Sequence, residues 1–208
     1  MISHKHKCIY IHIPRTAGTS IEFALCGDNW WKIDSSTKHL LASQAKEIYA
    51  DYWDSYFKFS IVRDPCTRML SALRYANYFC PDAQSCNNFK EFLEGYMIQF
   101  GFPKTVEFDY RFYKSVPSAR GLENSVYLNL LDEELDYVGR FENLNESFGE
   151  ITKFLGLGNI ELSRRQASKP FDKSKVVDRQ SLDLLEQLYR RDYEYFGYEL
   201  PDSEIAAQ

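Results

Sequence analysis

The feature that most constrains the fold of this chain is the stretch from Ile9 to Ser20, IYIHIPRTAGTS. β-Branched and apolar residues over Cys8 to Ile13 predict a central strand, and this strand runs directly into a polar turn. The next apolar residues share one face of a helix; they are Ile21, Ala24 and Leu25. A strand, a polar turn and a helix in immediate succession favour an α/β fold.

The turn has the composition of an anion-binding loop. Gly18 allows the backbone to approach a ligand closely, and Thr19 and Ser20 offer hydroxyls that cap the helix. The first amides of the helix point into the turn, so a phosphate or a sulfate group is the ligand that suits it. The same succession of strand, one-glycine loop and helix also occurs as an ordinary connection that binds no ligand. The turn alone leaves that interpretation open.

A second unit of the same kind follows. Phe57 to Val62, FKFSIV, is a short apolar strand that ends at Arg63-Asp64-Pro65. The residues after it form the apolar face of a helix; they are Met69, Leu70, Leu73 and Ala76. Two such units predict a parallel sheet, and ligands bind such sheets beyond the carboxyl ends of the strands. We therefore expect the two polar turns to face one site.

The other elements are predicted from apolar spacing. We expect helices over Ser43–Tyr52, Asn88–Phe100 and Asn145–Leu155, strands over Ser125–Leu131 and Tyr137–Phe141, and a final helix with Leu182, Leu185, Leu188, Tyr189 and Phe196 that stops at Gly197. The stretch from Gly101 to Asn124 mixes proline, glycine, aromatic and charged residues. That composition is typical of a long surface excursion that shapes the substrate side of an enzyme.

Bulk composition narrows the class of protein. With 208 residues, of which 44% are hydrophobic, the chain is long enough for one core, and we expect a single domain over 1–208. The net charge of -5 argues against nucleic-acid binding, so any anion site is local. No stretch approaches the roughly 18 to 20 apolar residues of a membrane span. Met1 to Lys7 is a polar leader without a signal core, so we expect a cytoplasmic protein.

Cysteine and histidine usage gives no metal site. The cysteines are odd in number and lack paired spacing, which favours thiols over a disulfide framework, although a pair between Cys80 and Cys86 stays open. No cluster of histidine, cysteine and acidic residues has the spacing of metal ligands. The sequence does not indicate an oligomeric state.

The second turn adds a phosphate-binding pattern, VRDPCTRMLS. It places Arg63 at a strand end and Ser71 on the following helix, and an arginine fork with a hydroxyl can jointly bind a phosphate. Together with PRTAGTS over Pro14–Ser20, this pattern resembles the PAPS-dependent sulfotransferases, in particular their carbohydrate 2-O-sulfotransferase-like branch. Lys38-His39-Leu40, DYVGRFEN over Asp136–Asn143 and the stretch Arg190–Tyr198 also resemble segments of that family.

The resemblance implies a three-layer, P-loop-like α/β fold with a central parallel sheet flanked by helices. It implies that the first turn binds the 5′-phosphosulfate of PAPS through Arg15, Thr16, Ala17, Gly18, Thr19 and Ser20. It implies that Arg63 and Ser71 bind the 3′-phosphate. Residues 79–124 are covered least and would form a variable excursion on the acceptor side.

The reaction that the resemblance implies is transfer of a sulfonate group from PAPS to an acceptor hydroxyl, which gives PAP and a sulfate ester without a metal. Arg15 stands where the family usually has lysine; it supplies positive charge but cannot act as a general acid. His39 matches the catalytic histidine of the family, and a histidine is a suitable base near neutral pH. We expect His12 to lie mid-strand with a structural role, and His4 and His6 to have none.

Two further residues have two interpretations each, and a third is expected to be structural. Ser168 and Lys169 belong either to a late basic loop that closes over the nucleotide or to an exposed charged loop. Arg68 is expected to support the second turn by pairing with Asp64 or Glu22.

Two other functions stay open at this point. A P-loop kinase or other NTPase would require a lysine after the glycine, and Gly18-Thr19-Ser20 lacks it. A non-catalytic nucleotide-binding protein on the same fold is motivated by Arg15. A saccharide is the acceptor that the resemblance favours, and the negative net charge favours a neutral or short one. Steroid-like lipids, peptide tyrosines and small metabolites remain alternatives.

Overall fold

The computed structural model describes residues 1–79, 88–99, 120–158, 160–163 and 176–199. The chain forms two compact units. The first comprises Met1–Arg63, Ser118–Arg120 and Asn129–Ala167, and the second comprises Asp64–Pro117, Gly121–Leu128 and Ser168–Gln208. Cys80, Cys86 and most of the segment 79–124 lie outside the described residues, so the predicted excursion stays a prediction.

The first unit is built on a four-stranded sheet with the order β1-β2-β3-β4. Its strands are β1 (Ile2–Ser3), β2 (Cys8–Ile11), β3 (Phe57–Val62) and β4 (Tyr137–Arg140). Strands β2, β3 and β4 are parallel, with Tyr10 opposite Phe59 and Ser60 opposite Val138, whereas β1 runs antiparallel to β2. The predicted α/β class is confirmed as a mixed, mostly parallel sheet. The correction is β1, which lies in the segment expected to be a polar leader.

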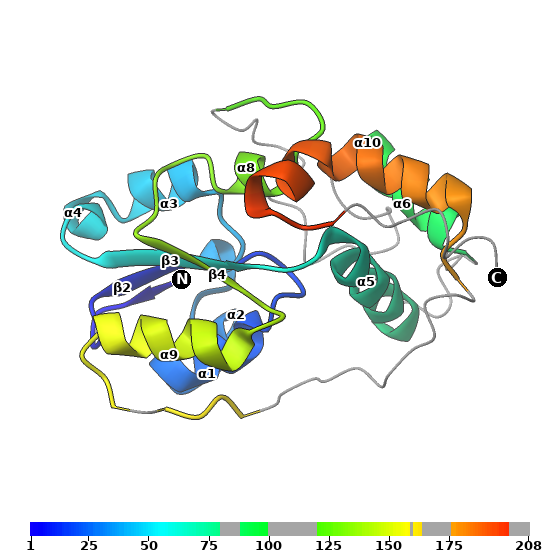
Figure 1. The fold of residues 1–208 in the computed structure, drawn as a ribbon. Helices are drawn as coiled ribbons and strands as arrows, with labels where there is room; N and C mark the ends of the chain where they lie inside the picture. The colour runs from blue at the N-terminus through cyan, green and yellow to red at the C-terminus, as the bar shows by residue number, and fades with distance from the viewer. Residues whose placement is uncertain (80–87, 100–119, 159, 164–175, 200–208) are drawn as a thin grey trace. The chain divides into compact units, whose positions relative to one another are not determined.

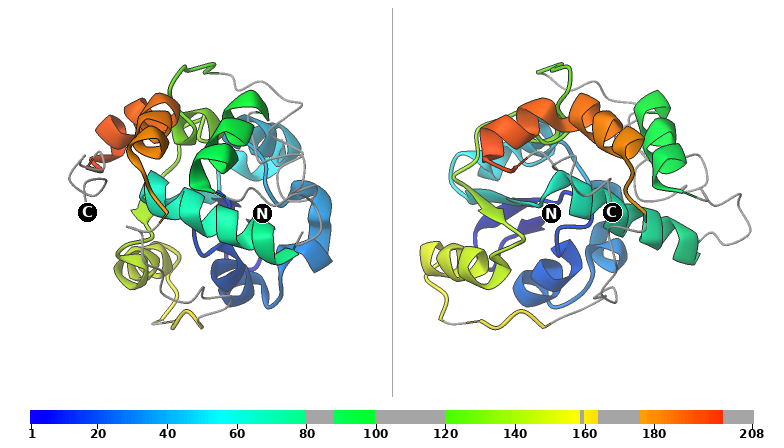
Figure 2. Two further views of the ribbon diagram at one scale, coloured as in Figure 1. Left: turned by 90° about the vertical axis from the view of Figure 1, so that its right-hand side faces the viewer. Right: turned by 45° about the vertical axis from the view of Figure 1, so that its right-hand side comes forward.

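Helices cover both faces of this sheet. Helices α1 (Gly18–Cys26) and α9 (Leu144–Phe154) lie on one face, and α3 (Ala42–Ile48) and α4 (Ala50–Trp53) lie on the other (Figures 1 and 2). The core under α1 and α9 contains Cys8, Tyr10, Ile21, Leu25, Phe59, Ile61, Phe148 and Ile151, all buried. Because alternate residues of a strand point to the same face, Cys8 and Tyr10 meet Ile21 and Leu25 of α1. The unit therefore has the three expected layers.

Short elements follow α1 in the same unit. Helix α2 (Trp30–Asp34) begins where the Asn29 side chain accepts a hydrogen bond from the Trp31 amide, and the 3₁₀ helix η1 (Ser35–Thr37) follows it. Neither was expected from the sequence. The predicted helix over Ser43–Tyr52 is present as two helices, α3 and α4, that meet at Tyr49.

The predicted strand over Ser125–Leu131 is wrong, because this segment contains the helical turn α8 (Tyr127–Leu130). The buried carboxylate of Asp192 accepts hydrogen bonds from the amides of Val126, Tyr127 and Leu128 and from the Ser125 hydroxyl. A carboxylate that collects successive amides fixes a helical turn, as an N-cap residue does. The element was unpredictable because its cap lies more than sixty positions away in the chain.

The second unit is helical in its described part. It contains α5 (Pro65–Phe79), α6 (Phe89–Gln99) and α10 (Arg179–Phe196), and Gly197 ends α10 at a φ of 61°. Arg68 is buried here, and its guanidinium donates a hydrogen bond to the Tyr189 hydroxyl. Its amide donates to the Asp64 carbonyl over 2.9 Å. This backbone contact links Arg68 to Asp64, and the pairing of their side chains stays a prediction.

No helix in the described part of the chain is long and apolar enough to cross a membrane. In the described part of the chain, Cys8, Cys26 and Cys66 are not in disulfide bonds.

Candidate active site

The turn after β2 holds two residues in the left-handed backbone region. Arg15 has a φ of 69° and Ala17 a φ of 67°, and neither is glycine. Each such residue costs on the order of 1–3 kcal/mol, and conformations of this kind concentrate at ligand-binding sites. Left-handed residues within a turn also aim successive amides at one point, which makes a concave anion-binding surface. The backbone of the turn therefore suits the phosphosulfate expected from the sequence.

The start of α1 lacks a side-chain cap. The helix begins at Gly18, and its N-cap residue is Ala17, which makes no side-chain hydrogen bond. Thr19 and Ser20 lie inside the first turn, so the prediction that they cap the helix is wrong. A helix N-terminus without a capping oxygen presents its first amides to a ligand, and the helix dipole favours a negative one.

Gly18 also has a role that the sequence did not predict, whereas its close approach to a ligand stays a prediction. Its φ is not in the left-handed region, but a Cβ atom at this position would lie 1.8 Å from Nε2 of His12. The glycine thus makes room for the His12 ring beneath the turn. The buried hydroxyl of Thr16 donates a hydrogen bond to the Ile13 carbonyl over 2.7 Å, and this bond stabilises the turn itself.

Arg63 lies beside this turn, at the end of β3. Its Nη1 atom donates to the carbonyl oxygen of Arg15 over 3.2 Å, and its guanidinium carbon lies 4.1 Å from the centre of the Phe141 ring. The expectation that both polar segments meet is confirmed for Arg63. Ser71 is buried on α5 in the second unit, and Ser168 and Lys169 lie outside the described residues.

His39 lies next to the end of β2. Its Nδ1 atom is 3.0 Å from the carbonyl oxygen of His12. Because a carbonyl only accepts hydrogen bonds, we assign the ring proton to Nδ1 and the lone pair to Nε2. Burial lowers the pKa of His39 well below 6.5, helped by His12 and Lys38 and opposed by the bond to the carbonyl and by Glu22. The ring is therefore neutral at pH 7, as a proton acceptor must be.

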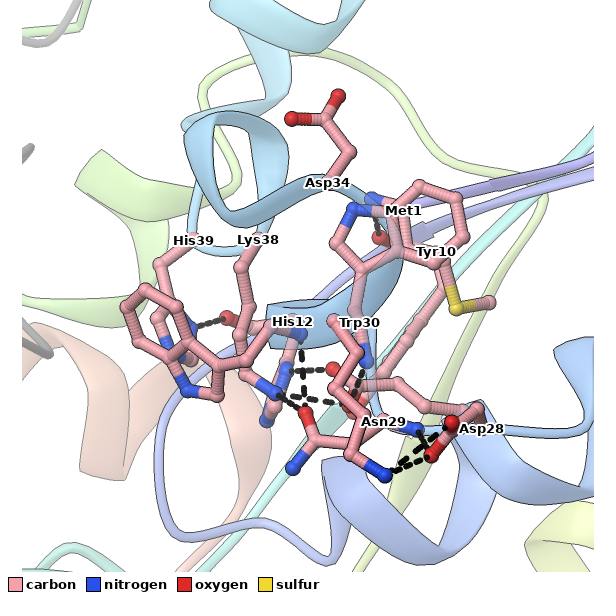
Figure 3. A network of polar contacts seen from close by, with 12 residues as sticks. Met1, Tyr10, His12, Asp28, Asn29, Trp30, Asp34, Lys38 and His39 are labelled. Atoms are coloured by element: carbon pink, nitrogen blue, oxygen red, sulfur yellow. Dashed lines mark hydrogen bonds and ion pairs between the residues drawn. The ribbon is translucent and has the colours of Figure 1, made fainter.

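A buried polar cluster surrounds this histidine (Figure 3). The carboxylate of Glu22 accepts from Nδ1 of His12 over 2.7 Å, from Nζ of Lys38 over 2.7 Å and from the Trp30 amide over 3.0 Å. Nζ of Lys38 also donates to the Asn29 side chain over 2.7 Å. Burial opposes ionisation of Glu22, but His12 and Lys38 outweigh it and lower its pKa to about 2.

This cluster corrects two expectations. Glu22 pairs with His12 and Lys38 and not with Arg68. His12 follows the last residue of β2, and its ring contacts both Glu22 and Gly18. The pKa of His12 is lowered by burial, although Glu22 opposes this, so we assign a neutral His12 that donates to an ionised Glu22.

One aromatic side chain missed by the sequence analysis borders the site. The half-buried ring of Trp31 meets the ring of His39 edge-on, with 5.9 Å between their centres. Nζ of Lys38 lies 5.4 Å from the centre of the same indole. No motif in the sequence points to Trp31. Glu22 could have been found, because it is a charged residue next to Ile21 on the buried side of α1.

Comparison with known proteins decides the class. A model described as the sulfotransferase family matches residues 1–199. The chain belongs to the sulfotransferase family. It is thus an enzyme of the EC 2.8.2 type, and membership implies PAPS as the sulfonate donor. The match favours this function over the kinase or NTPase alternative. No curated protein and no solved structure matches the chain.

Proposed function

We propose that this sulfotransferase moves the sulfonate group of PAPS to a hydroxyl of a neutral or short saccharide, with His39 as the general base. The observation that carries the proposal is the hydrogen bond from Nδ1 of His39 to the His12 carbonyl. It leaves the lone pair of a neutral ring on Nε2, where it can accept a proton.

The proposed step is an in-line displacement at sulfur. The acceptor oxygen forms a bond to sulfur, the bond from sulfur to the bridging phosphate oxygen breaks, and the hydroxyl proton passes to Nε2 of His39. PAP leaves with the electron pair of the broken bond. As in phosphoryl transfer, the protein contributes mainly position and charge neutralisation.

The residues of the first unit divide between these tasks. The backbone of the turn from Arg15 to Ser20 binds the phosphosulfate, and the Arg15 guanidinium neutralises charge on the leaving phosphate. Arg63, which is tied to the Arg15 carbonyl, binds the 3′-phosphate. Ser71 enters the proposal on its place in the VRDPCTRMLS motif alone.

The saccharide acceptor is favoured by the position of Trp31. Aromatic rings bind the apolar faces of sugars, and this indole lies next to the proposed base. Steroid-like lipids also pack on aromatic rings, so they belong in the same experiment.

The test is an acceptor screen with sulfonate-labelled PAPS. Neutral mono- and oligosaccharides, a sulfated oligosaccharide, a tyrosine peptide and a hydroxysteroid are offered in parallel, and the product is located by mass spectrometry. The proposal predicts label on a neutral saccharide hydroxyl and none when His39 is replaced by alanine. Label on the peptide or steroid alone would contradict the acceptor class, and full turnover by His39→Ala would contradict the base.

A further inference from the structure

Glu22 is buried at a point where three segments of the first unit converge. Its side chain is fully buried, and its two oxygens receive donors from His12, Lys38 and the Trp30 amide. These donors come from the end of β2, from the segment before His39 and from the start of α2. One carboxylate therefore links the turn after β2 with the segment that carries the base.

Burying the charges of this cluster has a desolvation cost that stability alone does not explain. Glu22 and Lys38 are both almost fully removed from water, and burying such a pair often stabilises a protein less than an apolar pair of the same volume would. What a buried, fully bonded pair supplies is a fixed geometry. Its contact with His12, whose ring lies against that of His39, points to the geometry that it fixes.

The route from Glu22 to His39 is continuous. The Glu22 carboxylate accepts a hydrogen bond from Nδ1 of His12, and the His12 ring packs against Gly18. The His12 carbonyl in turn accepts a hydrogen bond from Nδ1 of His39. The two imidazole rings lie 4.5 Å apart between centres. On the other side, Glu22 holds the ammonium of Lys38, the residue next to His39. Movement of either donor would disturb the Nδ1 bond that leaves Nε2 as the basic nitrogen.

We propose that Glu22 is a positioning residue that acts through His12 and Lys38. It keeps His39 in the neutral tautomer that carries its proton on Nδ1, so that Nε2 can take the proton of the substrate hydroxyl. This inference rests on the proposed role of His39 as the base. Glu22 itself touches neither donor nor acceptor in this account.

The charges around His39 predict the direction in which its pKa changes when Glu22 or Lys38 is replaced. Two charged groups that act on His39 are Glu22 from α1 and Lys38 beside it in the chain, and the second titratable ring that faces it is His12 from the end of β2. Glu22 favours the protonated imidazolium, whereas Lys38 disfavours it. Removing the carboxylate should therefore lower the pKa of His39, and removing the ammonium should raise it.

The first experiment is independent of turnover. Long-range ¹H–¹⁵N NMR spectra of the full chain report the tautomer and the titration of His39 in wild type, Glu22→Gln and Lys38→Met. We expect the Nδ1–H form in wild type, a shift of the titration to lower pH or a mixed tautomer in Glu22→Gln, and a shift to higher pH in Lys38→Met. Unchanged tautomer and titration in both variants would overturn the inference even if the protein is a sulfotransferase as proposed.

The second experiment asks whether Glu22 acts through His39. At saturating PAPS, Glu22→Gln should lower kcat by about tenfold to a hundredfold, less than the roughly 10²- to 10⁴-fold expected for loss of the base itself. In a His39→Ala background the same substitution should have no further effect on kcat, because the residue through which it acts is gone. An additive loss in both backgrounds would show that Glu22 acts elsewhere.

Two further variants complete the design. Glu133→Gln makes the same change at an ion pair with Lys46 that is exposed, and kcat should stay at the wild-type value. Where Glu22→Gln alone does not fold, the Glu22→Gln, Lys38→Met double variant leaves no buried charge without a partner. It should fold with a lowered kcat, and a wild-type kcat in this variant would overturn the inference.

Discussion

The Nδ1 atom of His39 lies 3.0 Å from the carbonyl oxygen of His12, the second residue before the turn that we propose binds the phosphosulfate. This one hydrogen bond joins the proposed base to the strand end that leads into the proposed donor site. It also selects the nitrogen that accepts the proton, since the other nitrogen is occupied as a donor. The base and the donor turn are thereby held by the same short stretch of backbone.

The first prediction concerns Arg63. Arg63→Ala should weaken PAP binding by roughly ten- to a hundredfold, because it removes a charge-assisted contact worth about 1.5–3 kcal/mol. The affinity for AMP, which has no 3′-phosphate, should fall much less. Calorimetric titration of both nucleotides measures the difference. Arg179→Ala, at an exposed ion pair with Asp183, is the matched control and should leave PAP affinity unchanged. Equal losses for AMP and PAP would place the 3′-phosphate elsewhere.

The second prediction concerns Gly18. A methyl group there would collide with Nε2 of His12 at 1.8 Å, so Gly18→Ala should displace the ring and cost about 1–3 kcal/mol of unfolding free energy. Urea unfolding measures this cost. Gly149→Ala in α9 has open space around its Cβ and should instead stabilise by up to about 1 kcal/mol, because alanine is the better helix former. A stable Gly18→Ala variant would mean that the His12 ring does not depend on this position.

The third prediction is loss of stability in acid. His12 and His39 have folded-state pKa values lowered below 6.5 by burial, so below that pH the unfolded chain binds protons that the folded one does not. Stability should begin to fall at about pH 6.5, at about 1.4 kcal/mol per pH unit for each histidine. Glu22, whose pKa falls from 4.5 to about 2, adds a loss between those two values.

Urea midpoints between pH 8 and pH 3 test this prediction. The two substitutions His12→Asn and His39→Asn should each flatten the fall that begins near pH 6.5, because asparagine does not titrate. A wild-type midpoint that stays level from pH 7 to pH 5 would show that both rings take up protons in the folded state as readily as in the unfolded chain.

The fourth prediction concerns Trp31. If its indole supports a sugar face, Trp31→Ala should raise the acceptor KM by about two- to tenfold, which corresponds to the roughly 0.5–1.5 kcal/mol of an aromatic contact. The KM for PAPS should stay the same, and Trp31→Phe should recover most of the loss. An effect on the PAPS KM alone would assign the indole to the donor.

The sequence was sufficient for those elements whose causes are local. The apolar run Phe57–Val62 is β3 with the same bounds, and Gly197 ends α10 where expected. The turn after β2 and the approach of Arg63 to it followed from the order of strands in a parallel sheet.

Features that depend on distant partners could not be predicted in this way. The helical turn α8 depends on Asp192, and β1 depends on pairing with β2 in a segment with few apolar residues. In the site, His39 was found by resemblance, but its neutral state and its bond to His12 needed the structure. Glu22 was one of two partners considered for Arg68, and only the packing shows that it pairs with Lys38 and His12 instead.

The role of His39 as the base of a sulfotransferase is tested by a paired measurement on His39→Ala. Its affinity for PAP is measured by calorimetry, and its transfer of labelled sulfonate from PAPS to the saccharide acceptor is measured beside wild type. We expect PAP affinity within a few-fold of wild type and a kcat lower by about 10²- to 10⁴-fold. Turnover at the wild-type rate by this variant would contradict it.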